Sequence, residues 1–102
     1  MKSYRKSLPP LDSLLFFNAA AGSRSLGAAA EDLFVTQAAV SKRIQRLEEW
    51  LGTPLFSREG RALQITDAGA GLAADVEIAL DFLERAIDKV ILMSLEINLS
   101  LS

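Results

Sequence analysis

The feature that most constrains the fold is a pair of adjacent helix signals in the first half of the chain. A short helical pattern follows Ser25 and a longer one follows Thr36, and both residue types are favoured at helix N-caps. Only Phe34-Val35 separates the two patterns, and the longer one continues to Leu51, where a glycine and a proline stop it. Two helices joined by so few residues are the outline of a helix-turn-helix.

The segments on either side complete a small domain. An apolar helical pattern runs from Leu11 to Ala21, after Pro9-Pro10 as a start signal. Beyond the helix that ends at Leu51, two short alternating runs flank the Glu59-Gly60 turn and predict a β-hairpin, or wing. The sequence therefore predicts a mainly α fold, a winged helix-turn-helix with a three-helix core and a β-hairpin wing, over residues 8–65.

A long helical pattern then begins at Thr66, a plausible N-cap, and predicts a linker or dimerisation helix over residues 66–91. Its apolar residues follow the 4-3 spacing of a coiled-coil seam, which requires a partner helix. We expect the dimer seam to consist of Leu72, Val76, Ala79, Leu80, Leu83, Ile87 and Val90.

Within the tail, residues 92–102, polar and apolar residues alternate strictly from Ser94 to Ser102, which is the pattern of a β-strand. Three interpretations stay open: the first strand of a domain missing from this chain, a strand used for self-association, or an altered tail.

Charge is divided unevenly between the two halves of the chain, although the net charge is only −2. Residues 1–61 carry nine Lys+Arg against six Asp+Glu, a net of +3, and residues 62–102 carry two against seven, a net of −5. A basic first half suits contact with phosphate, and an acidic second half suits a segment that points away from it.

Several functions are disfavoured by composition. The chain has no Cys and no His, which removes thiol nucleophiles, the commonest zinc ligands and the commonest general base. No carboxylate pair or glycine run resembles a catalytic or phosphate-binding motif, so we expect no enzyme, no metal and no cofactor. Apolar stretches are too short to cross a bilayer, so we expect a cytoplasmic protein that does not bind membranes.

The helix after Thr36 carries the residues expected to meet DNA. On a helical wheel, Val40, Ile44 and Leu47 share the core side. Opposite this side lie Ala38, Lys42, Gln45 and Arg46, with Ser41 at the flank. Gln37 is nearer the core side, but in the first turn of a helix that enters the groove end-on its side chain can still reach a base edge. Because hydrogen bonds and methyl contacts to base edges read sequence in the major groove, we expect base reading by Gln37, Ala38, Ser41 and Lys42. Phosphate contacts are expected from Thr36, Arg43 and Arg46, and wing contacts from Arg58 and Arg61.

The chain also resembles LysR-type transcriptional regulators. The resemblance rests on Ala29-Ala30, residues 35–44, Leu47-Glu48-Glu49, Leu51-Gly52, Leu55-Phe56 with Arg58 and Arg61, and residues 63–69, and it covers residues 8 to about 90. The opening Leu8-Pro9-Pro10-Leu11 looks most like the branch of glycine-cleavage activators and β-lactamase regulators. The resemblance puts the same four residues, Gln37, Ala38, Ser41 and Lys42, in the major groove.

The resemblance further implies antiparallel pairing of the linker helices and, in a full-length form, a tetramer and a two-lobed effector-binding domain that we expect to be absent here. We therefore expect a bacterial transcription regulator that binds a pseudo-palindromic site in double-stranded DNA as a homodimer. One alternative is a winged-helix module for protein–protein interaction, which the polar face of the third helix disfavours. A second alternative, a small carboxylate-based enzyme, has no supporting constellation.

Overall fold

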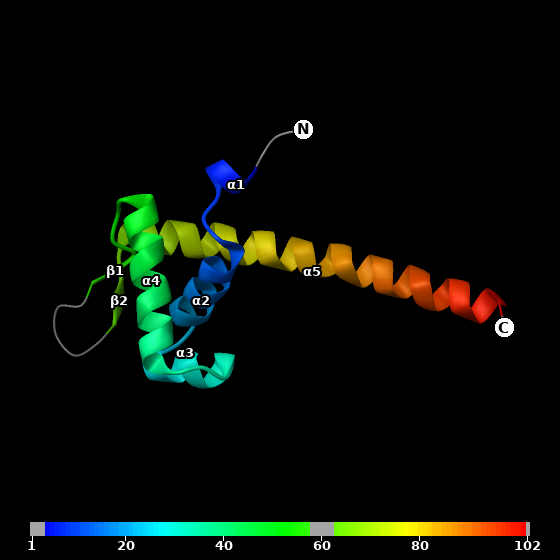
Figure 1. The fold of residues 1–102 in the computed structure, drawn as a ribbon, viewed down its shortest axis with the longest axis horizontal. Coiled ribbons are helices and arrows are strands. Elements are labelled where there is room, and N and C mark those ends of the chain that lie inside the picture. The colour runs from blue at the N-terminus through cyan, green and yellow to red at the C-terminus, as the bar shows by residue number, and fades with distance from the viewer. Residues whose placement is uncertain (1–3, 58–62, 102) are drawn as a thin grey trace.

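The computed structural model describes residues 4–57 and 63–101, which form a small helical body and one long helix that runs away from it (Figure 1). The elements are α1 (Tyr4–Ser7), α2 (Leu11–Ala21), α3 (Leu26–Leu33), α4 (Gln37–Leu51), β1 (Phe56–Ser57), β2 (Gln64–Ile65) and α5 (Asp67–Leu101). The predicted fold class is confirmed. The short α1 was not predicted, and the three predicted core helices correspond to α2, α3 and α4.

Side-chain caps set the starts of three helices, as the sequence predicted. The Ser25 hydroxyl accepts a hydrogen bond from the Ala28 N–H at 3.1 Å. The Thr36 hydroxyl accepts one from the Ala39 N–H at 3.1 Å, and Thr66 accepts one from the Gly69 N–H at 3.0 Å. Each bond satisfies a first-turn N–H that has no partner inside its own helix.

The turn between α3 and α4 is made by a residue in the left-handed backbone region. Phe34 has φ 57°, and its N–H donates to the Glu31 carbonyl while the next N–H, of Val35, donates to the Ala30 carbonyl. This geometry closes α3 within two residues and lets α4 begin at once. The Phe34 side chain is 93% exposed, so a non-glycine residue occupies a left-handed position without packing against the core.

The core of the body lies where α2, α3 and α4 meet under the first strand. Phe17 of α2 is fully buried, and its ring lies 5.7 Å from that of Phe56 at an interplanar angle of 59°. The other buried apolar residues of this cluster are Ala20, Ala29, Ala30, Val40, Ile44, Leu47 and Leu55. The predicted core side of α4 is therefore confirmed, and the small Ala29 and Ala30 let α3 approach its neighbours closely.

The wing is an antiparallel pair in which Phe56 faces Ile65 and Ser57 faces Gln64. Its base is tied to α4, because the Glu48 carboxylate accepts hydrogen bonds from the N–H groups of Leu55 (2.7 Å) and Phe56 (3.3 Å). The predicted strands are confirmed over these residues. Residues 58–62, which include the predicted turn and both wing arginines, lie outside the described residues.

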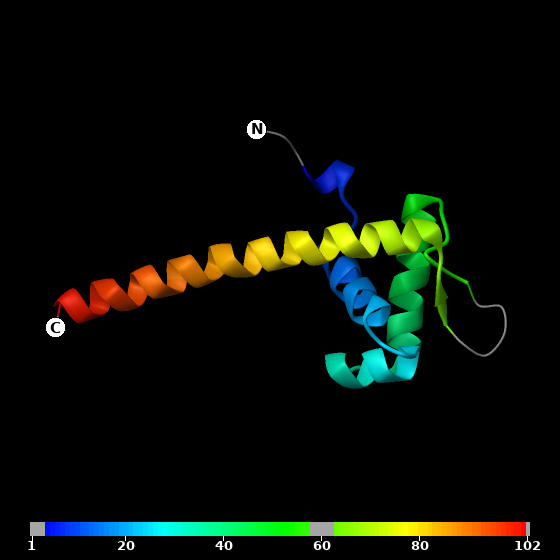
Figure 2. The same ribbon diagram turned by 180° about the vertical axis from the view of Figure 1, so that it is seen from behind.

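The start of α5 lies unusually close to the chain before β1. A β-carbon placed on Gly69 would lie 2.2 Å from the Leu55 carbonyl oxygen, so only glycine fits. The same stretch is held by the Thr66 hydroxyl, which donates to the Pro54 carbonyl at 2.9 Å. This close approach fixes the direction in which α5 leaves the body (Figures 1 and 2).

The strand pattern of the tail does not form a strand over residues 92–101, and the predicted end of the helix near residue 91 is wrong. α5 continues without a break to Leu101. A strand would need a neighbour to pair with, whereas each residue added to an existing helix gains an internal backbone hydrogen bond. The alternating pattern alone therefore did not decide the local structure. Within the part of the chain that the structure describes, no helix combines the length and apolarity needed to cross a membrane.

Candidate nucleic-acid interface

The first half of α4 presents the predicted base-reading residues on the side away from the core. Gln37, Ala38 and Lys42 are exposed, and Ser41 is half-buried at the flank. Val40, Ile44 and Leu47 hold the opposite side of the helix in the core at exposures of 0–1%. The structure thus brings the four predicted residues together at the end of α4 that lies beside α3 (Figure 1).

Gln37 has a neighbour that the sequence did not reveal. A β-carbon added to Gly27 would lie 3.4 Å from the Gln37 side-chain oxygen, so this amide lies over the first turn of α3. Gly27 therefore leaves room for a polar side chain at the entrance of the recognition helix.

The contacts of Thr36, Arg43 and Arg46 with phosphates stay a prediction, and the three residues have different surroundings in the structure. Thr36 and Arg46 are exposed, and Thr36 caps α4. Arg43 instead pairs with Asp12 of α2, with a nitrogen–oxygen distance of 3.0 Å, and its guanidinium carbon lies 5.1 Å from the centre of the Phe16 ring. An arginine engaged in this way links α2 to α4, so contact with a phosphate would compete with the ion pair.

Gln45 is a further candidate that the prediction did not select. It is exposed and lies one and two turns beyond Ser41 and Gln37 on the same row of α4. The signal that could have found it is this spacing of four residues. No comparable signal links Arg43 to Asp12, which are 31 positions apart.

The wing lies on the other side of α4 from α2, next to the helix that carries the polar face (Figure 2). Gln64 of β2 is exposed there. Arg58 and Arg61 lie outside the described residues, so their predicted role in the wing stays a prediction.

Of the seven residues predicted to form the dimer seam, the first two face the body of their own chain. Leu72 packs against the core cluster, and Val76 is only 7% exposed. Leu80 is half-buried, whereas Ala79, Leu83, Ile87 and Val90 are exposed. The seam face of α5 is thus continuous with the face that packs on α2.

A three-helix core, a wing and a polar, cap-started α4 define a winged helix-turn-helix DNA-binding domain. The profile of the bacterial regulatory helix-turn-helix protein, lysR family, matches residues 11–70, more than half of the chain. The chain therefore belongs to the LysR family.

Two curated relatives extend this assignment. The glycine cleavage system transcriptional activator of Escherichia coli (strain K12) is 46% identical over 85 residues, which are 83% of this chain and 28% of that protein. Its homolog in Haemophilus influenzae is 40% identical over 97 residues, which are 95% of this chain and 32% of that protein. The chain thus spans about a third or less of the length of these relatives.

A solved structure agrees with the fold along most of the chain. The crystal structure of the complex between the BenM DNA-binding domain and catB site 1 DNA has a TM-score of 0.80 and 27% sequence identity. The similarity covers 84% of this chain and 96% of that one. The chain carries the DNA-binding region of a LysR-type transcriptional regulator.

Proposed function

We propose that this chain binds a specific site in double-stranded DNA as a homodimer and regulates transcription in the bacterial cytoplasm, without enzymatic activity. The observation that carries the proposal is the polar face of α4, where Gln37, Ala38 and Lys42 are exposed at the start of a helix fixed by its core side. The similarity to a domain solved in complex with DNA supports it.

The side chains of this face suit the edges of base pairs in the major groove. Lys42 can donate to guanine O6 or N7, and the Gln37 amide can donate and accept at adenine. Ser41 can donate or accept, and the Ala38 methyl group can contact a thymine methyl group. These four residues choose the sequence in the proposed complex.

Affinity comes largely from phosphates. The Thr36 hydroxyl and the first N–H groups of α4 lie at the start of the helix, and Arg46 is exposed two to three turns further along it. We assign the wing arginines, Arg58 and Arg61, to the adjacent minor groove or its phosphates. Because each neutralised phosphate releases counterions, binding should weaken steeply as salt rises.

The dimer uses the exposed part of the α5 seam. Ala79, Leu83, Ile87 and Val90 lie on one face of a helix that leaves the body, which suits pairing with the same face of a second copy. A two-fold pair holds two copies of α4 over two half-sites, so the target is a pseudo-palindrome. We propose effector binding and a tetramer only for a full-length form.

Fluorescence anisotropy with a library of duplexes at several salt concentrations tests the proposal. We expect salt-dependent, sequence-selective binding by the wild type, and loss of selectivity of roughly tenfold or more at one base position in Gln37→Ala and in Lys42→Ala. Lys6→Ala, which removes an equal charge from exposed α1, is the control and should keep the wild-type base preference.

The same experiment separates the two functional classes. If no duplex binds even at low salt, the DNA proposal fails, and a module for protein–protein interaction becomes the better interpretation of α4. If duplexes bind but Lys42→Ala and Lys6→Ala lose affinity equally for all sequences, α4 does not read bases.

A further inference from the structure

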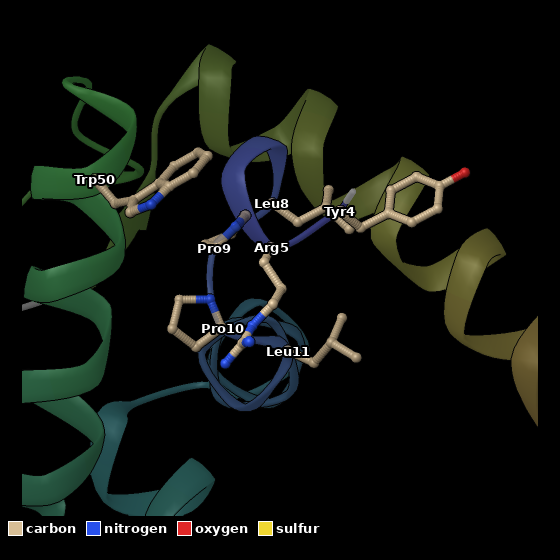
Figure 3. Close-up of a pocket in the computed structure, with 7 residues that line it drawn as sticks. All are labelled: Tyr4, Arg5, Leu8, Pro9, Pro10, Leu11 and Trp50. Atoms are coloured by element: carbon tan, nitrogen blue, oxygen red, sulfur yellow. The ribbon is translucent and has the colours of Figure 1, made fainter. Parts of the chain in front are cut away.

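An apolar groove opens beside the start of α2, outside the face assigned to DNA. It has a volume of about 640 Å³ and is lined by Tyr4, Arg5, Leu8, Pro9, Pro10, Leu11 and Trp50 (Figure 3). Leu11 is 58% exposed and Trp50 is 47% exposed, although both are large apolar residues. The groove therefore offers apolar area that a partner could bury, with one arginine in its lining.

The last three turns of α5 form a second exposed apolar surface. Residues 91–101 contain seven large apolar side chains, each more than half exposed, and a single charge, Glu96. At 100° per residue these side chains point in every direction around the helix. One partner helix covers only one stripe of such a segment, so a broader surface is needed to bury it.

These two surfaces cannot meet within one chain. α5 is a continuous helix of 35 residues, about 52 Å long, and it carries its last turns away from the body (Figure 1). Any contact between the groove and residues 91–101 must therefore join two copies.

The body decides how two copies of α5 can pair, given the proposed dimer on which this inference rests. Leu72 and Val76 already pack on their own body, so the seam available to a partner runs from Ala79 to Val90. In a parallel pair, both bodies would lie on the seam side of their helices at the same end and would compete for the same space. The pair must therefore be antiparallel.

An antiparallel pair over Ala79 to Val90 is centred between residues 84 and 85. Residues 91–101 of one copy then lie opposite residues 68–78 of the other, the part of α5 that packs on the body. Because the seam and the body share one side of α5, the partner's last turns run into the edge of the body where α2 begins. The groove opens at this edge, beside Leu11.

We propose that residues 91–101 of a second copy occupy the groove formed by the N-terminal segment, the start of α2 and Trp50. Two-fold symmetry fills both grooves at once. The charges agree, because Arg5 lines the groove and Glu96 is the one charged residue of the segment that enters it. The contact joins each DNA-binding body to the helix of its partner and so restrains the spacing of the two α4 helices.

Trp50 makes the proposal measurable, because it is the one tryptophan of the sequence and it lines the groove. We would measure its emission maximum and its quenching by acrylamide, with the oligomeric state followed by sedimentation. In the wild-type dimer we expect a blue-shifted maximum and a quenching constant roughly twofold below that of the diluted monomer, because burial removes the indole from water.

The decisive variant is Ile97→Asp/Leu101→Asp, on the seam side of α5, and Asn98→Asp/Ser100→Asp, on the flanks of that side, is its control with the same added charge in the same segment. The first should stay dimeric through the seam but return Trp50 to its monomer quenching constant, and the second should keep the wild-type value. Equal quenching of Trp50 in the wild-type dimer and the Ile97→Asp/Leu101→Asp dimer would overturn the docking while leaving the dimer intact. A wild type that stays monomeric at all concentrations would overturn both the dimer and the docking.

Discussion

The two halves of this molecule use apolar residues in opposite ways. In the body, residues 11–76, large side chains such as Phe17, Val40 and Ile44 are at most 1% exposed. In the distal half of α5, residues 77–101, every large apolar side chain except Leu80 is at least half exposed. The body is stabilised by contacts inside one chain, whereas the distal half presents its apolar area to a second molecule. Matched substitutions in the two regions test this difference.

The largest expected effect is the contrast between two phenylalanines. Phe17→Ala removes a fully buried ring that packs on Phe56, and should lower the free energy of unfolding by about 3–5 kcal/mol. Phe82→Ala removes a ring that is 67% exposed, and should change it by less than about 0.5 kcal/mol. Urea unfolding at monomer concentrations measures both, and equal losses would break the comparison.

Two glycines of α5 give the next contrast. Gly69→Ala places a β-carbon against the Leu55 carbonyl and should destabilise the body by about 2–3 kcal/mol. At Gly71 the added carbon meets nothing within 4 Å, so Gly71→Ala should stabilise the helix by about 0.5–1 kcal/mol. Thermal unfolding followed by circular dichroism should show Tm shifts of opposite sign. A shared sign would mean that α5 does not approach β1 as closely as described.

Two glutamates sharpen the comparison for polar groups. Glu48→Ala leaves the N–H groups of Leu55 and Phe56 without their acceptor and should cost about 2 kcal/mol. Glu84→Ala removes an exposed carboxylate from α5 and should change stability by less than about 0.5 kcal/mol. Hydrogen exchange of the Leu55 and Phe56 amides should accelerate in the first variant only. Unchanged exchange there would show that α4 does not anchor the wing.

The smallest expected effect concerns helix capping. Thr36→Ala removes the hydroxyl that accepts from the Ala39 N–H and should destabilise the body by about 1 kcal/mol. Ser94→Ala lies inside an exposed helix and should be neutral or stabilising by a few tenths, about 0.3 kcal/mol, because Ala is the better helix former. Chemical denaturation of both variants measures the sign of the change in the free energy of unfolding. An unchanged stability of Thr36→Ala would show that the Thr36 cap does not stabilise α4.

The elements that the sequence predicted well are those with a local signal at each end. Ser25, Thr36 and Thr66 cap their helices because a short hydroxyl side chain reaches an N–H three residues later, whatever surrounds it. The core side of α4 followed from the spacing of Val40, Ile44 and Leu47. The candidate DNA-binding face could be predicted for the same reason, since it is the other side of that helix.

The errors and omissions have one physical cause, which is that they depend on contacts between distant segments. Residues 94–101 alternate like a strand but extend a helix, because the described chain offers no strand beside them. The ion pair of Arg43 with Asp12 and its contact with Phe16 of α2 were not predicted, whereas the phosphate contact of Arg43 stays a prediction.

The sequence by itself determined where the helices begin, which side of each is apolar, and that α4 carries a polar face suited to DNA, because helix periodicity and capping are local. Only the tertiary structure decided that Gly69 must pass the Leu55 carbonyl and that Leu72 and Val76 belong to the body. It also decided that the free seam starts at Ala79. The apolar pattern of α5 is equally compatible with packing on its own body and with pairing to a second copy, and only contacts between segments far apart in the chain select between the two.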